Sequence, residues 1–255
     1  SEITEYIRRE VESYGFFLIL GITGNSSNNE KKYISEFISR KVDGVIWVPQ
    51  LTYVNDIEHM KKLDEYGIPY LFLAAYYEQS SAPFVMCNLK KGSYLMTQYL
   101  IERDIHNIVM LIGDRRVDET YISGYKMALE EAGLVYSESN VYESTYHFDD
   151  VQKLAMEILK ERPEAIMTNS DFTACAVLQA ARIKGLSIPR DLSVCGYDDV
   201  IYATINQIPL TTVSQPIERM CKLAVNNLMN LLQYGIVPDS VILEPSLIIR
   251  DTVKR

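Results

Sequence analysis

The sequence lacks several features that would place it in a specialised class of protein. No apolar run approaches the ~20 residues that a transmembrane helix needs, and the N-terminus opens on charged residues in a helix-like pattern rather than on a signal peptide. Only four of the 255 residues are cysteines, and they are scattered through apolar segments without the spacing of a disulfide framework or a zinc site. This use of cysteine predicts a reducing, cytoplasmic setting.

The chain also has fewer basic residues than acidic ones. The chain has 25 lysines and arginines against 34 aspartates and glutamates, which gives a formal net charge of −9. A domain that binds duplex DNA takes most of its affinity from basic side chains that face phosphates. We therefore expect no DNA-binding surface in this chain. If the protein controls a gene, its DNA-binding domain lies elsewhere.

The motifs of common enzyme classes are missing too. The sequence has no Gly-x-Ser-x-Gly elbow, no Walker loop and no Gly-x-Gly-x-x-Gly fingerprint. Its three histidines, His59, His106 and His147, lie far apart without metal-ligand spacing, and we expect them at the surface or at helix ends. The sequence therefore predicts no enzyme activity, no metal site and no cofactor.

Short apolar runs alternate with amphipathic stretches along most of the chain. Expected helices cover residues 3–14, 28–40, 54–66, 92–102, 120–132, 151–160 and 172–184, and expected strands cover residues 16–20, 45–48, 70–73, 108–112, 140–142, 165–168 and 192–194. Repeated strand–helix–strand units with continuously apolar strands are typical of parallel sheets that helices cover on both faces. The order of the elements predicts two such sheets, divided near residues 103–106. Because ligands of open parallel sheets bind beyond the carboxyl ends of the strands, two facing lobes would form a ligand cleft.

Polar residues follow two of the expected strands. Asp198 and Asp199 could do acid–base work, hold a metal, cap the next segment or accept hydrogen bonds from ligand hydroxyls. Ser170 and Asp171 lie between a strand and a helix, where the residues alone favour Asp171 as the N-cap. The chain also has 18 tyrosines, and a few of them in a cleft would suit a sugar, which presents apolar ring faces beside hydroxyl groups.

Several segments resemble the LacI/GalR family of transcription repressors. Residues 185–199 read Gly-Leu-Ser-Ile-Pro-Arg-Asp-Leu-Ser-Val-Cys-Gly-Tyr-Asp-Asp, residues 209–216 read Pro-Leu-Thr-Thr-Val-Ser-Gln-Pro, and residues 244–250 match the family's end. Further matches lie at residues 42–46, 67–69 and 124–129. Within the family, residues 74–78 with 82–83 and the ending 244–250 are most similar to the arabinose repressors of Gram-positive bacteria, which join a winged-helix DNA-binding domain to such a sensor.

The resemblance implies a periplasmic-binding-protein-like α/β fold, in which two lobes each hold a parallel sheet flanked by helices and the chain crosses between them three times. The N-terminal lobe would contain residues 1–105 and about 216–236, and the C-terminal lobe residues 106–215 and about 237–255. A small effector, a sugar such as arabinose or a related carbohydrate, would close the cleft, change the geometry of a homodimer and alter operator binding through an N-terminal domain that this chain lacks. Family members also have a strand ahead of their first helix, and we expect that strand to be absent here.

The same resemblance assigns residues to the effector site. Asp198 would accept hydrogen bonds from ligand hydroxyls. Ser170 would lie at a polar position of the pocket with Asp171 beside it, and Tyr146 would lie against the ligand ring. Gln215 would lie on a crossover segment near the hinge.

Asn88 would begin a helix near the cleft.

Two positions depart from the family pattern. The family has an arginine three residues before the glycine of the Gly-Tyr motif, and this pocket position is here Tyr121. The family has Asp or Asn after the strand at 70–73, and this position is here Ala74. Losing a guanidinium and a carboxylate changes what the pocket can hydrogen-bond. One alternative is therefore a sensor whose effector is a modified sugar, another small molecule or a partner protein. A second alternative, with the same fold, is an extracytoplasmic sugar-binding protein of a transporter.

Overall fold

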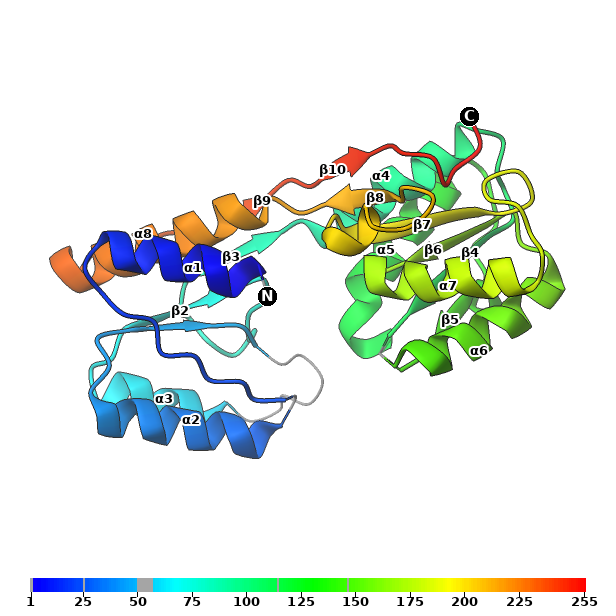
Figure 1. Cartoon of the computed structure of the whole chain (residues 1–255). Helices are drawn as coiled ribbons and strands as arrows, with labels where there is room; N and C mark the ends of the chain where they lie inside the picture. The colour runs from blue at the N-terminus through cyan, green and yellow to red at the C-terminus, as the bar shows by residue number, and fades with distance from the viewer. Residues whose placement is uncertain (1, 25, 50–56, 114, 146) are drawn as a thin grey trace. The chain divides into compact units, whose positions relative to one another are not determined.

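The computed structural model describes residues 2–24, 26–49, 57–113, 115–145 and 147–255, which form two compact units (Figure 1). Unit 1 consists of Ser1–Cys87 and Pro216–Leu243, and unit 2 of Asn88–Gln215 and Glu244–Arg255. The chain therefore passes between the units three times, as the resemblance implies.

The first passage comes after Cys87 and not near residues 103–106. The reason is the helix α4 (Leu89–Ile101), whose Met96, Tyr99 and Leu100 belong to the core of unit 2. The last passage likewise falls after Leu243 rather than near residue 236. The amphipathic pattern predicted the helix but not the sheet on which it packs.

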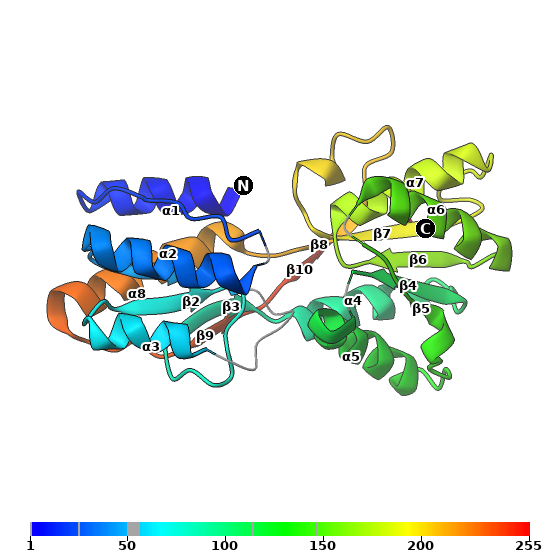
Figure 2. The ribbon, with the colours of Figure 1, turned by 90° about the horizontal axis from the view of Figure 1, so that it is seen from below.

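Unit 1 is built on a parallel sheet with the strand order β1-β2-β3-β9. Its strands are β1 (Val45–Trp47), β2 (Tyr70–Leu73), β3 (Phe84–Cys87) and β9 (Val241–Leu243). The helices α1 (Glu2–Ser13) and α8 (Ile217–Tyr234) lie over one face, and α2 (Ser27–Arg40) and α3 (Glu58–Glu65) lie over the other (Figures 1 and 2). The predicted α/β architecture is therefore present in this unit.

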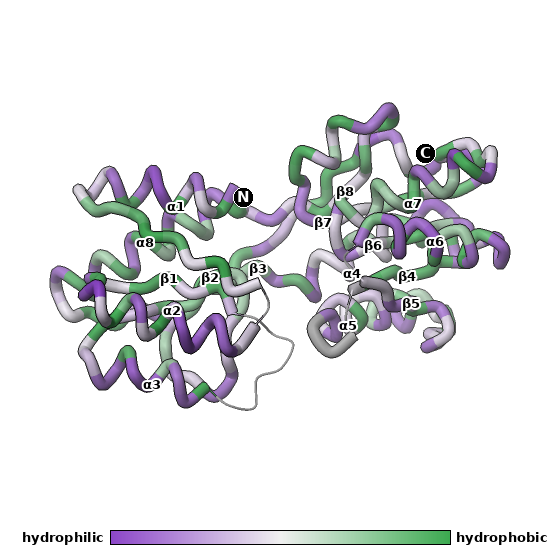
Figure 3. Tube along the Cα trace, turned by 60° about the horizontal axis from the view of Figure 1, so that its bottom comes forward, coloured by the Kyte–Doolittle hydropathy of each residue, from purple (hydrophilic) through white to green (hydrophobic). Residues whose placement is uncertain are grey.

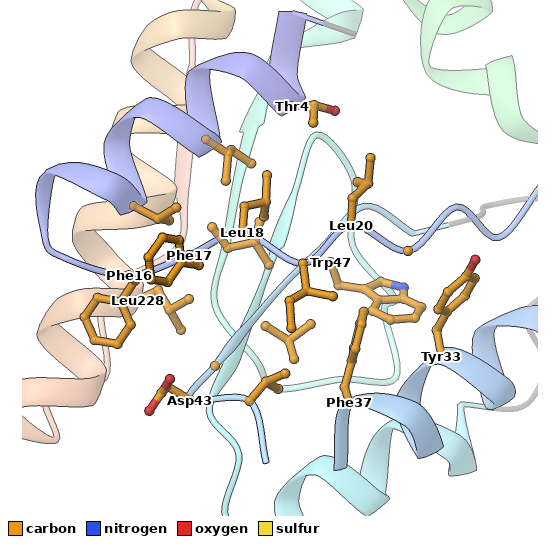
Figure 4. A pocket seen from close by; sticks show the side chains of 18 of the residues that line it. Thr4, Phe16, Phe17, Leu18, Leu20, Tyr33, Phe37, Asp43, Trp47 and Leu228 are labelled. Atoms are coloured by element: carbon orange, nitrogen blue, oxygen red, sulfur yellow. The ribbon is translucent and has the colours of Figure 1, made fainter. Parts of the chain in front are cut away.

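Residues 16–20, which the apolar run predicts as a buried strand, form no strand although the structure describes them. Figure 3 shows the segment after α1 as largely hydrophobic, yet the side chain of Phe17 is 91% exposed. A strand needs a hydrogen-bonded neighbour. The nearest strand, β1, is an edge strand that pairs with β2, and a groove separates it from this segment (Figure 4). The prediction for residues 16–20 is wrong for that reason.

Unit 2 is built on a larger sheet with the strand order β10-β8-β7-β6-β4-β5, parallel except for β10, which runs antiparallel to β8. Its strands are β4 (Ile108–Ile112), β5 (Val141–Glu143), β6 (Ala165–Thr168), β7 (Ser193–Asp198), β8 (Thr211–Ser214) and β10 (Ser246–Ile248). The helices α4 and α5 (Arg115–Glu131) cover one face, and α6 (Phe148–Ile158) and α7 (Asp171–Ile183) cover the other (Figure 2). Short 3₁₀ turns occupy Glu138–Asn140, Leu159–Glu161 and Ile201–Ala203.

Strand β4 shows why a strand covered on both faces is apolar throughout. Ile108, Met110 and Ile112 face the core beneath α4 and α5. Val109 and Leu111 face the core beneath α6 and α7. A parallel strand with helices on both faces favours apolar side chains along its length. In β6 and β7 the polar residues accordingly lie at the strand ends, whereas β8 carries the buried Thr211 and Thr212. Among the helices of the described residues, none has the length and apolar composition that a bilayer crossing requires.

Candidate functional site

The strands β6, β7 and β8 are parallel neighbours, so their carboxyl ends share one edge of the sheet in unit 2. Four of the expected site residues lie at this edge: Ser170 and Asp171 follow β6, Asp198 ends β7 and Gln215 follows β8. Open parallel sheets bind their ligands at this edge. We call this set of strand ends the acidic edge.

Asp198 is held in an unusual backbone conformation at the acidic edge. Its φ is 101° and that of Asp199 is 57°, a region that L-residues rarely adopt and that Asp tolerates better than most. Gln215 Nε2 donates a hydrogen bond to Asp198 Oδ1 at 2.7 Å. Burial raises the pKa of Asp198 to about 6, and the hydrogen bond from Gln215 opposes that rise. Within the described chain, the second carboxylate oxygen of Asp198 has no protein donor.

Asp199 has a different role from its neighbour. Its Oδ1 accepts a hydrogen bond from an Arg250 guanidinium nitrogen at 2.6 Å, and Arg250 also donates to the Leu210 carbonyl at 2.9 Å. This partly buried ion pair ties the end of the chain to the loop after β7. Of the two adjacent carboxylates, Asp199 is therefore structural and Asp198 is the one that faces a neutral amide.

Asp171 is buried behind the acidic edge. Its side chain is 0% exposed. Oδ1 accepts from the Thr212 hydroxyl at 2.6 Å and Oδ2 accepts from the Val200 backbone N–H at 2.8 Å. The N-cap of α7 is Ser170 and not Asp171, because the Ser170 hydroxyl accepts from the Thr173 backbone N–H at 3.1 Å. Asp171 links α7 to the neighbouring strand and loop, and both of its oxygens are occupied by protein donors.

Burial, together with the nearby Asp198 and Asp199, raises the pKa of Asp171 to about 7 from an ordinary value of 3.8. The folded chain thus holds this proton more tightly than the unfolded chain. The stabilising effect is complete below about pH 4 and is lost as the pH rises towards about 7. Asp171→Asn removes this titration while keeping one donor and one acceptor, since the Thr212 hydroxyl can turn to accept. We expect the melting temperature of the wild type to fall more than that of Asp171→Asn between about pH 4 and pH 7.

Circular dichroism melts of the two proteins across that pH range test the prediction. Asp171→Ala is the control: it leaves the Val200 N–H unpaired and should cost about 1–3 kcal/mol at every pH. Parallel pH profiles for the wild type and Asp171→Asn would show that Asp171 does not titrate as described.

Asn169 and Asp118, which were not predicted from the sequence, lie beside the acidic edge. Asn169 follows β6 directly, and its Nδ2 donates to Asp118 Oδ2 of α5 at 2.8 Å, an oxygen that also accepts from the Gly113 backbone N–H at 3.0 Å. Asn169 is 9% exposed and its Oδ1 is buried without a hydrogen-bond partner in the described structure. A buried acceptor without a partner costs about 1–3 kcal/mol, which a ligand N–H or O–H would offset. The signal that could have found Asn169 is its place at the end of a buried strand.

Tyr121 and Asn88 are the remaining expected site residues that the structure describes. The ring of Tyr121, on α5, packs edge-on against the ring of Tyr197, with centroids 4.9 Å apart. Asn88 is the N-cap of α4, and its Nδ2 donates to Glu244 Oε1 at 3.1 Å. Asn88 and Glu244 are the first residues of unit 2 after two of the passages, so this bond fixes the two entering segments to each other. Tyr146 lies outside the described residues.

In unit 1, Ala74 follows β2 with a φ of 67°. Asp and Asn adopt this left-handed conformation more readily than Ala, which agrees with the residue types expected from the family pattern. His106 and His147 are exposed, but His59 is buried in α3 with its Nε2 3.2 Å from Glu30 Oε2. His59 lies in the first turn of α3, so the expected helix-end position is confirmed, and Glu30, which also accepts from the Tyr77 hydroxyl, lies against its buried ring. Among the described residues, no group of His, Cys, Asp and Glu side chains is arranged to hold a metal ion.

Two units with parallel sheets flanked by helices, joined by three passages of the chain, define a periplasmic-binding-protein-like fold. The family described as periplasmic binding protein-like domain matches residues 97–253. The chain is 34% identical to the HTH-type transcriptional repressor PurR of Vibrio atlanticus, over 96% of this chain and 75% of the repressor. It is 30% identical to the HTH-type transcriptional regulator DegA of Bacillus subtilis, over 86% of this chain and 66% of the regulator. The structure of the transcriptional regulator CelR in complex with cellobiose is similar with a TM-score of 0.87 and 26% identity, over 98% of this chain and 77% of that one.

The chain belongs to the LacI/GalR family, as an effector-binding domain. The relatives are transcriptional regulators and not enzymes, which confirms the prediction of no enzyme activity, and regulators of this family work in the cytoplasm. The chain spans 66% of the length of DegA and 75% of the length of PurR.

Proposed function

We propose that this chain is the effector-sensing and dimerisation domain of a bacterial repressor, and that it binds a carbohydrate such as arabinose or a related sugar. The observation that carries the proposal is the pair of hydrogen-bond acceptors at the acidic edge. One oxygen of Asp198 and the Oδ1 of Asn169 have no protein donor among the described residues. Sugar hydroxyls are the donors that such acceptors select.

The charge of the acidic edge favours a neutral sugar over a phosphorylated one. Asp198 and Asp199 lie side by side, and the Arg250 guanidinium that faces them is engaged by Asp199. A phosphate group would meet the Asp198 carboxylate without a free cation in the described part of this edge. The complex of CelR with cellobiose supports a carbohydrate, because it shows that a relative of this chain binds a neutral sugar.

Control of transcription would require two partners. The operator DNA would be bound by a domain outside this chain, since the formal net charge here is −9 and the relatives PurR and DegA are HTH-type regulators. A second copy of the chain would form the homodimer through which ligand binding reaches the DNA. Asp198, Ser170, Gln215 and Asn88 would then couple the ligand to the segments that pass between the units.

A thermal-shift screen of the folded chain against neutral pentoses, hexoses and disaccharides, with sugar phosphates as the matched charged set, tests the proposal. A ligand at about 100 times its Kd stabilises the folded state by about 2.7 kcal/mol, which for a chain of this size raises the melting temperature by about 5–10 °C. We expect a neutral sugar to produce such a shift and calorimetry to confirm it. A hit confined to sugar phosphates would contradict the assignment of the acidic edge, and a blank across both sets would contradict a sugar effector.

A further inference from the structure

The turn that follows β7 carries Asp198, and its backbone is strained at two consecutive residues. The φ angles of Asp198 and Asp199 are 101° and 57°. Such conformations cost free energy and persist only where surrounding contacts hold them. Among the described residues, the other non-glycine positions with positive φ stand alone in the sequence: Lys41, Ala74, Asp104 and Arg162. The contacts around residues 198–200 therefore have an unusual amount of strain to offset.

Two of the contacts on this turn end on its side chains. Gln215 donates a hydrogen bond to the carboxylate of Asp198, and Arg250 donates one to the carboxylate of Asp199. Because a side chain can rotate about its χ angles, such bonds can persist while the backbone beneath them changes. These two contacts therefore do not by themselves fix the strained backbone.

Asp171 makes a contact that ends on the backbone of the turn. Its Oδ2 accepts a hydrogen bond from the Val200 N–H at 2.8 Å. Because the peptide unit is planar, this bond fixes the orientation of the peptide group between Asp199 and Val200. A flip of that peptide group would take the N–H away and leave a buried carboxylate oxygen without its donor, which is unfavourable. The bond to Asp171 thus opposes relaxation of the turn.

The carboxylate of Asp171 is itself held in place. Its side chain is 0% exposed, and the Thr212 hydroxyl of β8 donates to its Oδ1 at 2.6 Å. A Cβ at Gly196 of β7 would lie only 2.2 Å from that same oxygen. The carboxylate therefore lies directly on β7, at a residue whose lack of a side chain leaves room for it.

The backbone ahead of α7 is equally constrained. The Thr168 hydroxyl lies 2.8 Å from the Ser170 carbonyl oxygen and 3.0 Å from the Cys195 carbonyl oxygen of β7. Ser170 then caps α7, and its hydroxyl accepts from the Thr173 backbone N–H at 3.1 Å. These bonds fix Asp171, the first residue of α7, against β7.

We propose that Asp171 is a positioning residue for effector binding: through the Val200 N–H it holds the strained turn that orients the carboxylate of Asp198. The proposal rests on the proposed function, in which Asp198 binds the effector. Asp171 does not contact the effector itself, because protein donors occupy both of its oxygens. A binding site needs such support, since its side chains must stay within about 0.5 Å of the productive geometry.

Three variants separate positioning from a merely structural role. Asp171→Ala removes the acceptor of the Val200 N–H, whereas Asp171→Asn keeps an oxygen for it and should rescue the turn. Thr212→Val has nearly the same size as the wild type and removes the other hydrogen bond of Asp171. It is the matched control, because it should lower the melting temperature without releasing the turn. If Asp171→Ala does not fold, Asp171→Ser takes its place, since the serine hydroxyl ends one bond short of the carboxylate oxygens.

Nuclear magnetic resonance spectra of the ligand-free chain give the first readout. The side-chain amide of Gln215 reports on the position of Asp198, because its Nε2 donates to Asp198 Oδ1. A Gln215→Glu variant, which lacks these resonances, assigns them. We expect Asp171→Ala to move them to the values of a solvent-exposed glutamine, and Asp171→Asn and Thr212→Val to leave them near their wild-type values. Unchanged resonances in Asp171→Ala would overturn the proposal.

Calorimetric titrations with the neutral sugars of the thermal-shift screen, L-arabinose first, give the second readout. We expect Asp171→Ala to weaken binding by about 10–100-fold, as the loss of an orienting partner does at metal sites, and the other two variants to change it little. Equal losses in Asp171→Ala and Thr212→Val, or an equally large loss in Asp171→Asn, would overturn the proposal. If the wild type binds none of these sugars, the carbohydrate effector is contradicted, and the ligand-free spectra alone decide the role of Asp171.

Discussion

Replacing Asp198 by alanine is expected to weaken effector binding about 100-fold or more and to leave the fold intact. Hydrogen bonds to a charged group contribute about 1.5–3 kcal/mol each, and a sugar can place two hydroxyls on one carboxylate. The fold should survive because the side chain's hydrogen bond within the described chain is to Gln215 and burial already disfavours its charge. Calorimetric titration with the sugar found in the screen measures the loss of affinity, and a melt without ligand checks the fold.

Two further variants separate the roles of the adjacent carboxylates. Asp199→Asn breaks the ion pair with Arg250 and should lower stability more than affinity. Asp198→Asn keeps the size of the side chain and removes its titration. Because the pKa of Asp198 is about 6, wild-type affinity should fall as the pH drops through that value, whereas Asp198→Asn should show no such dependence. Unchanged affinity in Asp198→Ala would exclude Asp198 from the site.

Gly124→Ala is expected to lower the free energy of unfolding by about 3 kcal/mol, near the upper end for overpacked cores. A Cβ at Gly124 would lie 2.1 Å from the Lys90 carbonyl oxygen and 2.9 Å from the Tyr94 backbone nitrogen. Both atoms belong to the backbone of α4, so they cannot move aside without separating α4 from α5. For a chain of this size, the loss corresponds to a fall in melting temperature of about 6–12 °C.

Gly185→Ala is the matched control for that substitution. Gly185 has a φ of 73°, and no atom lies within 4 Å of the position that a Cβ would take there, so alanine meets strain in the backbone but no crowding. We expect a loss of about 1–2 kcal/mol. Urea denaturation measures both variants, and equal losses would show that contact between α4 and α5 is not what limits position 124.

Some strands could be predicted to the residue, although β3, β8, β9 and β10 were not predicted from the apolar runs. β2, β4 and β6 have the bounds that the apolar runs predict, because a strand covered on both faces is apolar from end to end. Helix starts were less predictable, since they are set by polar caps outside the apolar periodicity. α4 begins three residues before the expected 92, behind the cap Asn88, and α2 begins at Ser27, behind the cap Ser26, one residue before the expected 28.

The predicted strand ends bring Ser170 and Asp198 to one edge of a sheet, and the family resemblance adds Gln215, for which no strand was predicted. Neither could show which side chain contacts which. The roles of the carboxylates differ because their partners differ, and these lie far along the chain: Thr212 is 41 residues from Asp171, and Arg250 is 51 residues from Asp199. Such pairings leave no local pattern. Nor does a local pattern show that an oxygen of Asn169 lacks a donor.

The exposed run at residues 16–20 also bears on how the protein behaves in solution. Five consecutive apolar residues without a charge, beside the free edge of β1, form a template for β-pairing between molecules. Aggregation would then compete with folding and grow with protein concentration. Yield and solubility in the laboratory should therefore depend less on the acidic surface than on whether this one sheet edge is covered.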